Sequence, residues 1–391
     1  MNLKHIDIKS VYLKDLYSFA QGFAKAERCG RIVPITTTRA LAQMKNPYAK
    51  ENDIVLFVAY HEEECIGYIG QLPGLLNAKK QSHRVFWGST FYVADQYRGR
   101  GIGRLLLDQV VFLHQDFVVT RITSQAHNSL MGYGMKVLGY LDYFQLRVEK
   151  VHLLNKFFTV LSKNKESSDL KRRSGKGLKR FENHFYQLEK RIFYRIASGF
   201  ADKMAGNYQM SQVHEINESD FFKKPGHQWP FFYRGPEIIN WMLQHKWLLS
   251  KRQNTKRIQK YHFSAFRQFF SYIALKIYTE NLREYLGFIV ICISTSKGKT
   301  VLRILDHSLK DDDVIPMASA AALVCAAKYQ ADRVEFSKKM GDYLMTQIFF
   351  KKFLKKQQRE YIYFPKRNNS TLEKVKGKIK FDYCDGDTPF T

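Results

Sequence analysis

The stretch that decides the fold is residues 91–107, which read Phe91-Tyr92-Val93-Ala94-Asp95-Gln96-Tyr97-Arg98-Gly99-Arg100-Gly101-Ile102-Gly103-Arg104-Leu105-Leu106-Leu107. The pattern predicts a strand that runs into a glycine loop and then directly into a helix at 103–113. Glycines let the backbone turn sharply and approach a ligand without a collision at Cβ. The loop amides and the helix N-terminus form a cradle for anionic oxygens, and Arg98, Arg100 and Arg104 add positive charge. A pyrophosphate is the ligand that fits such a loop.

Other glycine motifs fit this stretch less well. A P-loop requires Gly-Lys followed by Ser or Thr, which is missing here. A dinucleotide-binding fingerprint requires its strand at the start of a βαβ unit and an acidic residue about 20 positions later. The loop of this chain instead follows the fourth predicted strand of a mixed sheet. A glycine turn without a ligand is the structural alternative, and the three nearby arginines argue against it.

The residues around the loop alternate between strand and helix patterns. Strands are predicted at 4–10, 54–60, 65–70, 84–93, 117–124 and 140–148, and helices at 15–27, after Thr36, at 103–113 and at 128–138. The middle of the chain is basic, with a solvated loop at 163–176 and a helical pattern at 181–200. The last part predicts strands at 286–294, 300–305, 333–336 and 378–383, and helices at 314–329 and 341–353.

The element order predicts an α/β fold built on a mixed sheet, of the α+β kind. The last part repeats the strand-strand-helix-strand-helix-strand order of the first. We therefore expect a ligand-binding domain at 1–150, a basic helical insertion or linker at 151–225, and a second α/β domain at 226–391.

The loop resembles the GNAT superfamily of acyl-CoA transferases, whose motif is Arg/Gln-x-x-Gly-x-Gly/Ala between a strand and a helix. Arg98, Gly101 and Gly103 match this motif, Val93 has the usual spacing to Arg98, and 128–140 resembles the family's Asn-led helix that ends in Gly-Phe. The resemblance covers about residues 1–150 and implies a domain that uses acetyl-CoA. The repeated element order adds the expectation of tandem GNAT-like domains, and the five scattered cysteines argue against a metal site. The resemblance also implies that the backbone of Phe91, Tyr92 and Val93 binds the pantetheine arm with help from Asn128. The pyrophosphate would be held by Arg98, Gly99, Arg100, Gly101, Ile102, Gly103 and Arg104.

The expected reaction is direct attack of a neutral amine on the thioester carbonyl, with backbone amides near Val93 stabilising the oxyanion. A general base must first deprotonate the ammonium group. Glu64, Asp95 and His127 are the candidates, and the sequence does not rank them. Many GNAT enzymes carry a tyrosine as general acid four residues before the glycine of Gly-Phe. That position is Met135 in this chain, and Tyr133, two residues earlier, is the remaining candidate for the acid.

The second half lacks a glycine loop. Its counterpart, residues 306–313, contains four aspartates and one lysine, which repel a pyrophosphate. We therefore expect this half to be degenerate for CoA binding and to shape the acceptor site or the assembly. In the C-terminal tail, Asp385 and Asp387 are candidates for binding an acceptor amine or a cation, although a structured turn is the preferred interpretation.

Composition leaves several partners open. The chain has 63 Lys plus Arg against 36 Asp plus Glu, a net charge of +27, which suits nucleic acid, an anionic membrane surface or a phosphate-rich ligand as well as plain solubility. Five scattered cysteines and no leader pattern at the N-terminus predict a cytoplasmic protein.

The whole chain is similar to bacterial two-part GNAT proteins found with surface-polysaccharide genes. The sequence thus predicts an N-acetyltransferase acting on an amine, such as an amino sugar. The alternatives are a nucleic-acid-binding or aminoacyl-tRNA-dependent protein, or an acetyl-CoA sensor without turnover.

Overall fold

The computed structural model describes residues 6–26, 32–79, 81–113, 116–150, 175–206, 208–222, 229–250, 261–365 and 370–388. Its strands are β1 Ile6–Tyr12, β2 Ile54–His61, β3 Glu64–Ala78, β4 Gln81–Val93, β5 Phe117–Thr120, β6 Lys136–Arg147, β7 Tyr208–Val213, β8 Phe231–Phe232, β9 Leu249–Ser250, β10 Phe266–Arg267, β11 Phe269–Thr279, β12 Tyr285–Ser296, β13 Lys299–Leu309, β14 Arg333–Ser337 and β15 Leu354–Tyr363. Its helices are α1 Leu16–Ala26, α2 Thr37–Met44, α3 Ile102–Leu113, α4 Ser124–Tyr133, α6 Gly175–Ala205, α7 Pro236–Gln244, α8 Ile315–Lys328, α9 Lys338–Thr346, α10 Ile348–Lys351 and α11 Thr371–Val375.

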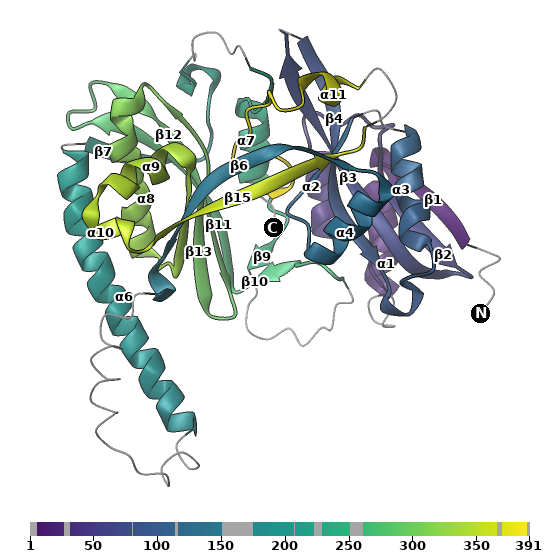
Figure 1. Cartoon of the computed structure of the whole chain (residues 1–391), viewed down its shortest axis with the longest axis horizontal. Coiled ribbons are helices and arrows are strands. Elements are labelled where there is room, and N and C mark those ends of the chain that lie inside the picture. Colours follow the sequence, from purple (N-terminus) through teal and green to yellow (C-terminus); the bar gives the residue numbers. More distant parts are fainter. Residues whose placement is uncertain are drawn as a thin grey trace.

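One large sheet runs through the molecule, in the order β1-β2-β3-β4-β5-β15-β6-β14-β13-β12-β11-β7, with β8 added on β3 (Figure 1). From each edge of the sheet toward its centre, the strands follow the same order of antiparallel and parallel pairings. Four strands follow one another antiparallel, β1 to β4 on one side and β7, β11, β12 and β13 on the other. A helix, α3 or α8, then leads to a strand parallel to the fourth, so β5 pairs with β4 and β14 pairs with β13.

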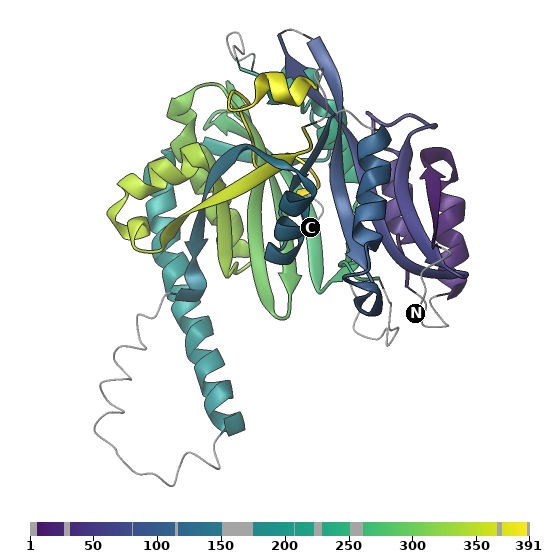
Figure 2. The ribbon, with the colours of Figure 1, turned by 45° about the vertical axis from the view of Figure 1, so that its right-hand side comes forward.

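The two halves exchange a strand at the centre of the sheet. β15, from near the end of the chain, pairs with β5 and with β6, while β6, from the first half, pairs with β14. Figures 1 and 2 show β6 and β15 crossing the middle of the molecule side by side. Each half of the sheet is therefore completed by a strand from the other half of the chain.

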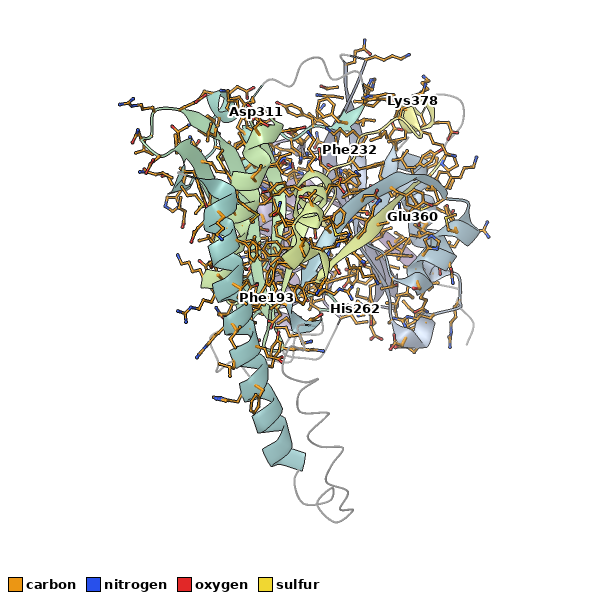
Figure 3. The ribbon with its side chains drawn as sticks, turned by 60° about the vertical axis from the view of Figure 1, so that its left-hand side comes forward. Phe193, Phe232, His262, Asp311, Glu360 and Lys378 are labelled. Atoms are coloured by element: carbon orange, nitrogen blue, oxygen red, sulfur yellow. The ribbon has the colours of Figure 1, made fainter. Side chains whose placement is uncertain are left out.

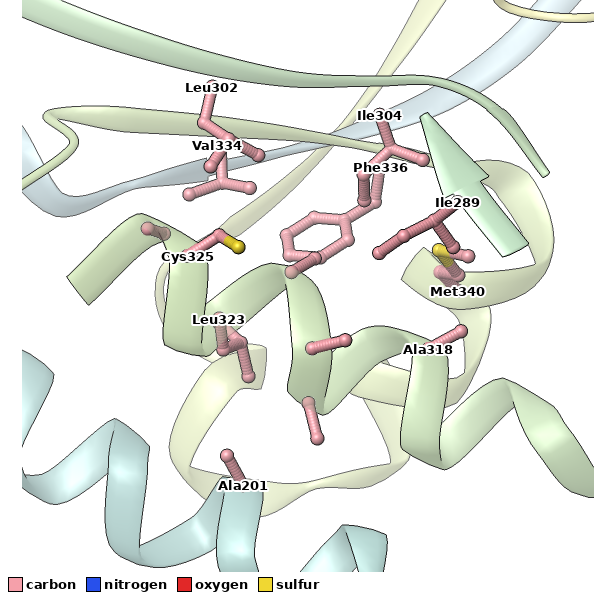
Figure 4. Packing of buried hydrophobic residues seen from close by; sticks show 14 of the residues in the cluster. Ala201, Ile289, Leu302, Ile304, Ala318, Leu323, Cys325, Val334, Phe336 and Met340 are labelled. Carbon is pink, nitrogen blue, oxygen red and sulfur yellow. The ribbon is translucent and has the colours of Figure 1, made fainter. Parts of the chain in front are cut away.

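Helices cover both faces of the sheet, which explains the apolar runs in the central strands. In β2, Phe57 and Ala59 face the cluster that contains α3, whereas Leu56 and Val58 face the cluster that contains α1 and α2. In β12, Ile289 and Ile291 pack toward α8, and Figure 4 shows Leu302, Ile304, Val334 and Phe336 meeting the same helix. Strands buried on both faces read as continuous hydrophobic runs rather than as an alternation.

A fourth cluster joins the two halves. It brings together Trp87 of β4, Phe288 of β12, Tyr361 of β15 and Phe381 of the C-terminal segment, and Phe381 stacks on Tyr361 at 4.1 Å between ring centroids. Phe232 of β8, labelled in Figure 3, lies in the same cluster, 4.5 Å from the Trp87 ring. The C-terminal segment is thus part of the core.

The predicted mixed sheet and the element order of the first half are confirmed, including the Thr36 side chain as N-cap of α2. The strand predicted at 378–383 is wrong, because this segment makes one isolated bridge, between Lys380 and Phe231. The last strand within the described residues is instead β15, whose charged residues obscure the alternation of polar and apolar residues that predicts a strand. The helix predicted at 341–353 corresponds to the end of α9 and to α10, which precede β15. The solvated loop predicted at 163–176 lies almost wholly outside the described residues. Within the described ranges, no helix has the length and apolarity needed to span a membrane.

Candidate functional site

A large site lies where two parallel strands, β4 and β5, part. β4 and β5 pair only at Phe86 with Phe117 and at Trp87 with Val118. Beyond Trp87 the strands diverge, and a cavity of about 1010 Å³ lies between residues 88–93 and residues 119–123. β4 is still paired with β3 on its other side. The edge of β4 that faces the cavity therefore offers backbone N–H and C=O groups to a ligand, which can bind there as a strand would.

An irregularity in β4 helps to open the gap. Gly70 pairs with Thr90 and Gln71 pairs with Gly88, so Ser89 is an extra residue in β4. Such a bulge bends the strand and increases its twist. Arg39 of α2, which is 8% exposed, donates hydrogen bonds to the hydroxyl of Ser89 and, at 3.0 Å, to the hydroxyl of Tyr261.

The glycine loop forms one end of the cavity. Gly99 and Gly101 have φ of +76° and +83°, which L side chains rarely adopt, and a Cβ on either would meet open space. The Arg98 side chain closes the loop by donating from Nε to the carbonyl of Val93 at 3.1 Å. In α3, the amide of Leu105 bonds to the carbonyl of Gly101 at 3.0 Å, while the earlier amides lack intrahelical acceptors. This end of the cavity is an anion cradle with room for a ligand.

Most residues predicted to bind the cofactor line this cavity. They are Phe91, Tyr92, Val93, Arg98, Gly99, Gly101, Ile102, Gly103 and Arg104. Arg100 is exposed and is not one of the lining residues, although its guanidinium lies 5.9 Å from the ring centroid of Tyr97, which does line the cavity. Asn128 is also exposed and lies on α4 away from the lining residues, whereas its neighbour Ser129 is one of them.

The end of α4 differs from the register that the sequence resemblance implied. The helix ends at Tyr133 with Gly134 in the left-handed region at φ +107°, and Gly139 lies inside β6, opposite Tyr361. The expected helix at 128–138 is therefore too long, because Gly134 is the better C-cap. Met135 is 3% exposed in the core beside α3. Tyr133 lines the cavity, and its hydroxyl donates to Asp108 of α3.

Three of the four catalytic candidates lie outside the cavity walls. Glu64 is exposed at the start of β3. Asp95 is 81% exposed in its side chain and forms an ion pair with Arg98 at 2.8 Å. His127 lies on α4, where its Nε2 is 2.8 Å from Oε2 of Glu360, a residue labelled in Figure 3. Of the predicted acid and base residues, only Tyr133 faces the cavity, and burial together with Asp108 raises the pKa of its hydroxyl.

The carboxylate that does face the cavity is Asp387. It is 7% exposed and lies on the cavity wall. Six residues before it, Phe381 stacks on Tyr361 of β15 and anchors the tail. Burial raises the pKa of Asp387 from 3.8 to about 6, although the guanidinium groups of Arg39, Arg121 and Arg359 oppose the shift. The sequence named Asp387, with Asp385, as a candidate for binding an acceptor amine or a cation, but not as a general base. The tail contains three aspartates, Asp382, Asp385 and Asp387, and no sequence signal distinguishes Asp387 from the other two.

The tail that carries Asp387 is anchored at several points. Arg234 forms ion pairs of 2.5 to 2.7 Å with Asp306, Asp382 and Asp385. Asp385 is therefore a structural residue, as the preferred sequence interpretation held, and it accepts a hydrogen bond from the amide of Asp382 at 2.7 Å. A Cβ on Gly386 would lie 3.1 Å from side-chain atoms of Thr120 and Trp87, so the tail passes closely below the point where β4 and β5 part.

The cavity walls are strongly positive. Arg39, Arg98, Arg104, Arg121 and Arg267 line them together with a single carboxylate, Asp387. Arg121 has a positive φ of 54°, a conformation that costs free energy in a non-glycine residue and is often found at functional sites. His262 also lines the cavity and stacks on Tyr92 at 4.3 Å between ring centroids. The site is thus suited to an anionic ligand, and its walls contain two groups that can accept a proton, the Asp387 carboxylate and the His262 imidazole.

Comparisons with known proteins agree with this geometry. The profile of the family described as "Acetyltransferase (GNAT) domain" matches residues 52–130, which include the glycine loop. No curated protein gives a significant match. Among solved structures, N-myristoyltransferase from Saccharomyces cerevisiae with bound myristoyl-CoA has a TM-score of 0.50 at 8% identity, over 97% of this chain and 85% of that chain.

Two bacterial structures are similar at lower scores. A GCN5-related N-acetyltransferase from Anabaena variabilis has a TM-score of 0.44 at 10% identity, over 92% of this chain and 72% of that chain. A probable N-acyltransferase from Enterococcus faecalis V583 has a TM-score of 0.48 at 8% identity, over 93% and 73%. The family match, the cradle between β4 and α3 and the parted strands identify residues 52–130 as the acyltransferase domain of a GNAT-superfamily enzyme.

Proposed function

We propose that this enzyme transfers an acetyl group from acetyl-CoA to an amine, with Asp387 as the general base. One observation carries the proposal. A single cavity contains the glycine cradle of α3 at one end and a buried carboxylate with a pKa of about 6 on its wall. A base of this pKa is mostly ionised at neutral pH and still accepts a proton readily.

The cradle and the free edge of β4 fit the two polar parts of CoA. The amides at the start of α3, together with Arg98 and Arg104, suit the pyrophosphate. Backbone groups of residues 88–93, which have no partner strand on the cavity side among the described residues, suit the amides of the pantetheine arm. The cavity volume is at the upper end of the range of about 300–1,000 Å³ usual for small-molecule sites, so an acceptor can bind beside the arm.

The residues of this chain have defined parts in the reaction. Acetyl-CoA supplies the thioester carbon, which the amine nitrogen attacks, so that a C–N bond replaces the C–S bond and the free thiol leaves. Asp387 accepts the proton that the amine loses. Backbone N–H groups of β4 near Val93 stabilise the negative charge on the carbonyl oxygen. Tyr133 lies on the cavity wall and donates a hydrogen bond from its hydroxyl to Asp108 in this structure, so it protonates the leaving sulfur only after the hydroxyl turns away from Asp108.

The acceptor is an amine, and the sequence resemblance favours an amino sugar. A buried carboxylate in the cavity favours turnover over a role as an acetyl-CoA sensor, since a sensor has no use for a group that accepts a proton. The second half supplies His262, Arg267 and Asp387 to the walls, which suits the predicted role of this half in shaping the acceptor site.

Calorimetry with acetyl-CoA and with desulfo-CoA tests the donor, beside a Gly101→Glu variant that places a negative charge in the cradle. Binding that is lost in the variant supports the proposal. Release of free thiol is then measured with a panel of amines and with acyl-CoA of increasing chain length. If the wild type fails to bind acetyl-CoA, the donor is wrong. If it binds but no amine accelerates thiol release, the sensor interpretation replaces the transferase.

A further inference from the structure

A second cavity of about 250 Å³ lies next to the first. Its charged lining residues are four cations, Arg267, Lys299, Arg303 and Arg333, and two carboxylates, Glu149 and Asp332. Arg267 lies on the walls of both cavities, so the two are neighbours. Four positive charges in a small space repel one another unless anions compensate them.

The two carboxylates of this cavity are already engaged. Oε2 of Glu149 lies 3.1 Å from Nζ of Lys299. Asp332, with a side chain that is 3% exposed, pairs with Lys190 of α6 at 2.8 Å and also accepts hydrogen bonds from the amide of Thr300 and the hydroxyl of Tyr186. The compensation for the three arginines must therefore come mainly from elsewhere.

Glu335, behind the cavity, provides part of it and is shared widely. Its Oε1 lies 3.1 Å from Nε of Arg333, and its Oε2 lies 3.4 Å from Nε of Arg303. It also accepts hydrogen bonds from Gln145 at 3.1 Å and from the hydroxyl of Tyr383. One carboxylate thus serves two guanidinium groups and two neutral donors.

Arg303 is left with unused hydrogen-bonding capacity. Its Nε and Nη1 are buried and make no well-directed hydrogen bond within the described ranges, although Nε lies 3.4 Å from Glu335 and the guanidinium lies beside the Cys292 thiol. A buried donor without an acceptor is costly, and a charged one more so. Such an atom on the wall of a basic cavity indicates an anionic ligand.

Arg267 points to the same ligand. Its Nε donates to Ser294 at 3.2 Å and its Nη1 to the carbonyl of Phe266 at 3.5 Å, so its partners are neutral. Burial and the nearby Arg303 lower the pKa of its guanidinium, a sign that the cations crowd one another. Arginine is the residue best suited to phosphate, because its planar fork donates two parallel hydrogen bonds to the oxygens.

We propose that the cavity lined by Arg267, Arg303 and Arg333 binds a phosphate group of the acceptor. The acceptor is then a small phosphorylated or nucleotide-linked amine, whose phosphate lies in this cavity while its amine reaches Asp387 in the neighbouring one. Arg267, on the wall between them, contacts both parts. This inference rests on the proposed function and adds the class of acceptor to it.

Binding of inorganic pyrophosphate tests the site without turnover. The titration is made by calorimetry in saturating CoA, which fills the glycine cradle and leaves the second cavity to the probe. We expect one site in the wild type and at least about tenfold weaker binding in Arg267→Gln, because charge-assisted hydrogen bonds are lost. Arg303→Lys keeps the charge beside Glu335 but not the fork, and it should weaken binding as well. Lys310→Gln, an exposed cation paired with Glu284, is the matched control and should bind as the wild type does.

Two results would overturn the inference. The first is no pyrophosphate binding in saturating CoA, and the second is equal binding by the wild type and by both arginine variants of normal thermal stability. Either result leaves the acetyl-CoA titration, and with it the proposed function, untouched. Inorganic phosphate, titrated in parallel, distinguishes a monoester site from a diphosphate site by the tighter ligand. A short single-stranded RNA that binds where pyrophosphate does not would assign the cations to nucleic acid instead.

Discussion

Replacing Asp387 with asparagine removes the carboxylate from the cavity wall and keeps the size of the side chain. With a pKa of about 6, this group is ionised to about 90% at pH 7 and to about 10% at pH 5. The wild-type kcat should therefore fall about tenfold from its plateau to pH 5, as the carboxylate takes up the proton that it needs to accept from the amine. In the Asp387→Asn variant we expect kcat to be lower by about 10²- to 10⁴-fold, the usual contribution of a general base.

The assay is the release of free thiol with an amine that the screen has identified, measured from pH 5 to pH 9. The variant should bind acetyl-CoA as the wild type does, because the charged groups that interact with Asp387 are Arg39, Arg121 and Arg359, none of which belongs to the glycine loop. Asp342→Asn, which makes the same chemical change at an exposed ion pair with Lys338, controls for the loss of a charge. If Asp387→Asn keeps the wild-type rate, or keeps the fall in kcat near pH 6, another group is the base and the assignment is refuted.

Other substitutions test the cradle, the tail and the rejected candidates. Gly101→Ala places a side chain at φ +83°, where a Cβ meets open space, so we expect only backbone strain, a loss of about 1–2 kcal/mol in the free energy of urea unfolding. Gly22→Ala, in the open middle of α1, should instead stabilise by about 0.5–1 kcal/mol. Arg234→Met leaves three aspartates without their buried partner and should cost about 3–5 kcal/mol in urea unfolding, and unchanged stability would contradict the anchoring of the tail. His127→Ala removes a partly exposed pair with Glu360 outside the cavity, so kcat should stay within about threefold, and a larger loss would restore His127 as a candidate base.

The sequence predicted the donor end of the site because the signals there are local. The strand, the glycines and the helix of residues 91–107 are contiguous, and the backbone geometry at Gly99 and Gly101 needs residues that tolerate positive φ. The same locality misled the prediction at the end of α4. Counting from Gly139 placed the helix end too late, whereas Gly134 with φ +107° ends it after Tyr133. Gly134 and Gly139 are both plausible ends of the helix by spacing. The sequence alone does not show that Gly139 belongs to β6 and that Gly134 is the helix cap.

The proposed base could not be found in the same way, because its place depends on pairings between distant parts of the chain. Asp387 reaches the cavity because Arg234, on the segment before α7, holds Asp382 and Asp385, and because Phe381 stacks on Tyr361 of β15. No local sequence pattern predicts these contacts. The strand β15 was not predicted either, because the polar and charged residues at 355–360 do not alternate with apolar ones. The acidic turns that looked suitable, Glu64 and Asp95, are exposed, as acidic side chains in turns usually are.

The strand exchange explains why donor and acceptor ends come from opposite ends of the chain. β5 pairs with β4 at only two residues. On its other edge it pairs with β15 at Thr120, Val119 and Val118, and this longer pairing fixes the position of β5. That pairing holds β5 apart from the far part of β4 and keeps the cavity open. The segment after β15 then returns beneath the opening and places Asp387 there, while β6 passes in the opposite direction to complete the other half of the sheet at β14. The glycine loop can hold a donor with residues of the first half alone, but the base and the cations of the second cavity exist only in the exchanged fold. In the proposed reaction, turnover and choice of acceptor therefore depend on the second half, even though that half has no glycine loop of its own.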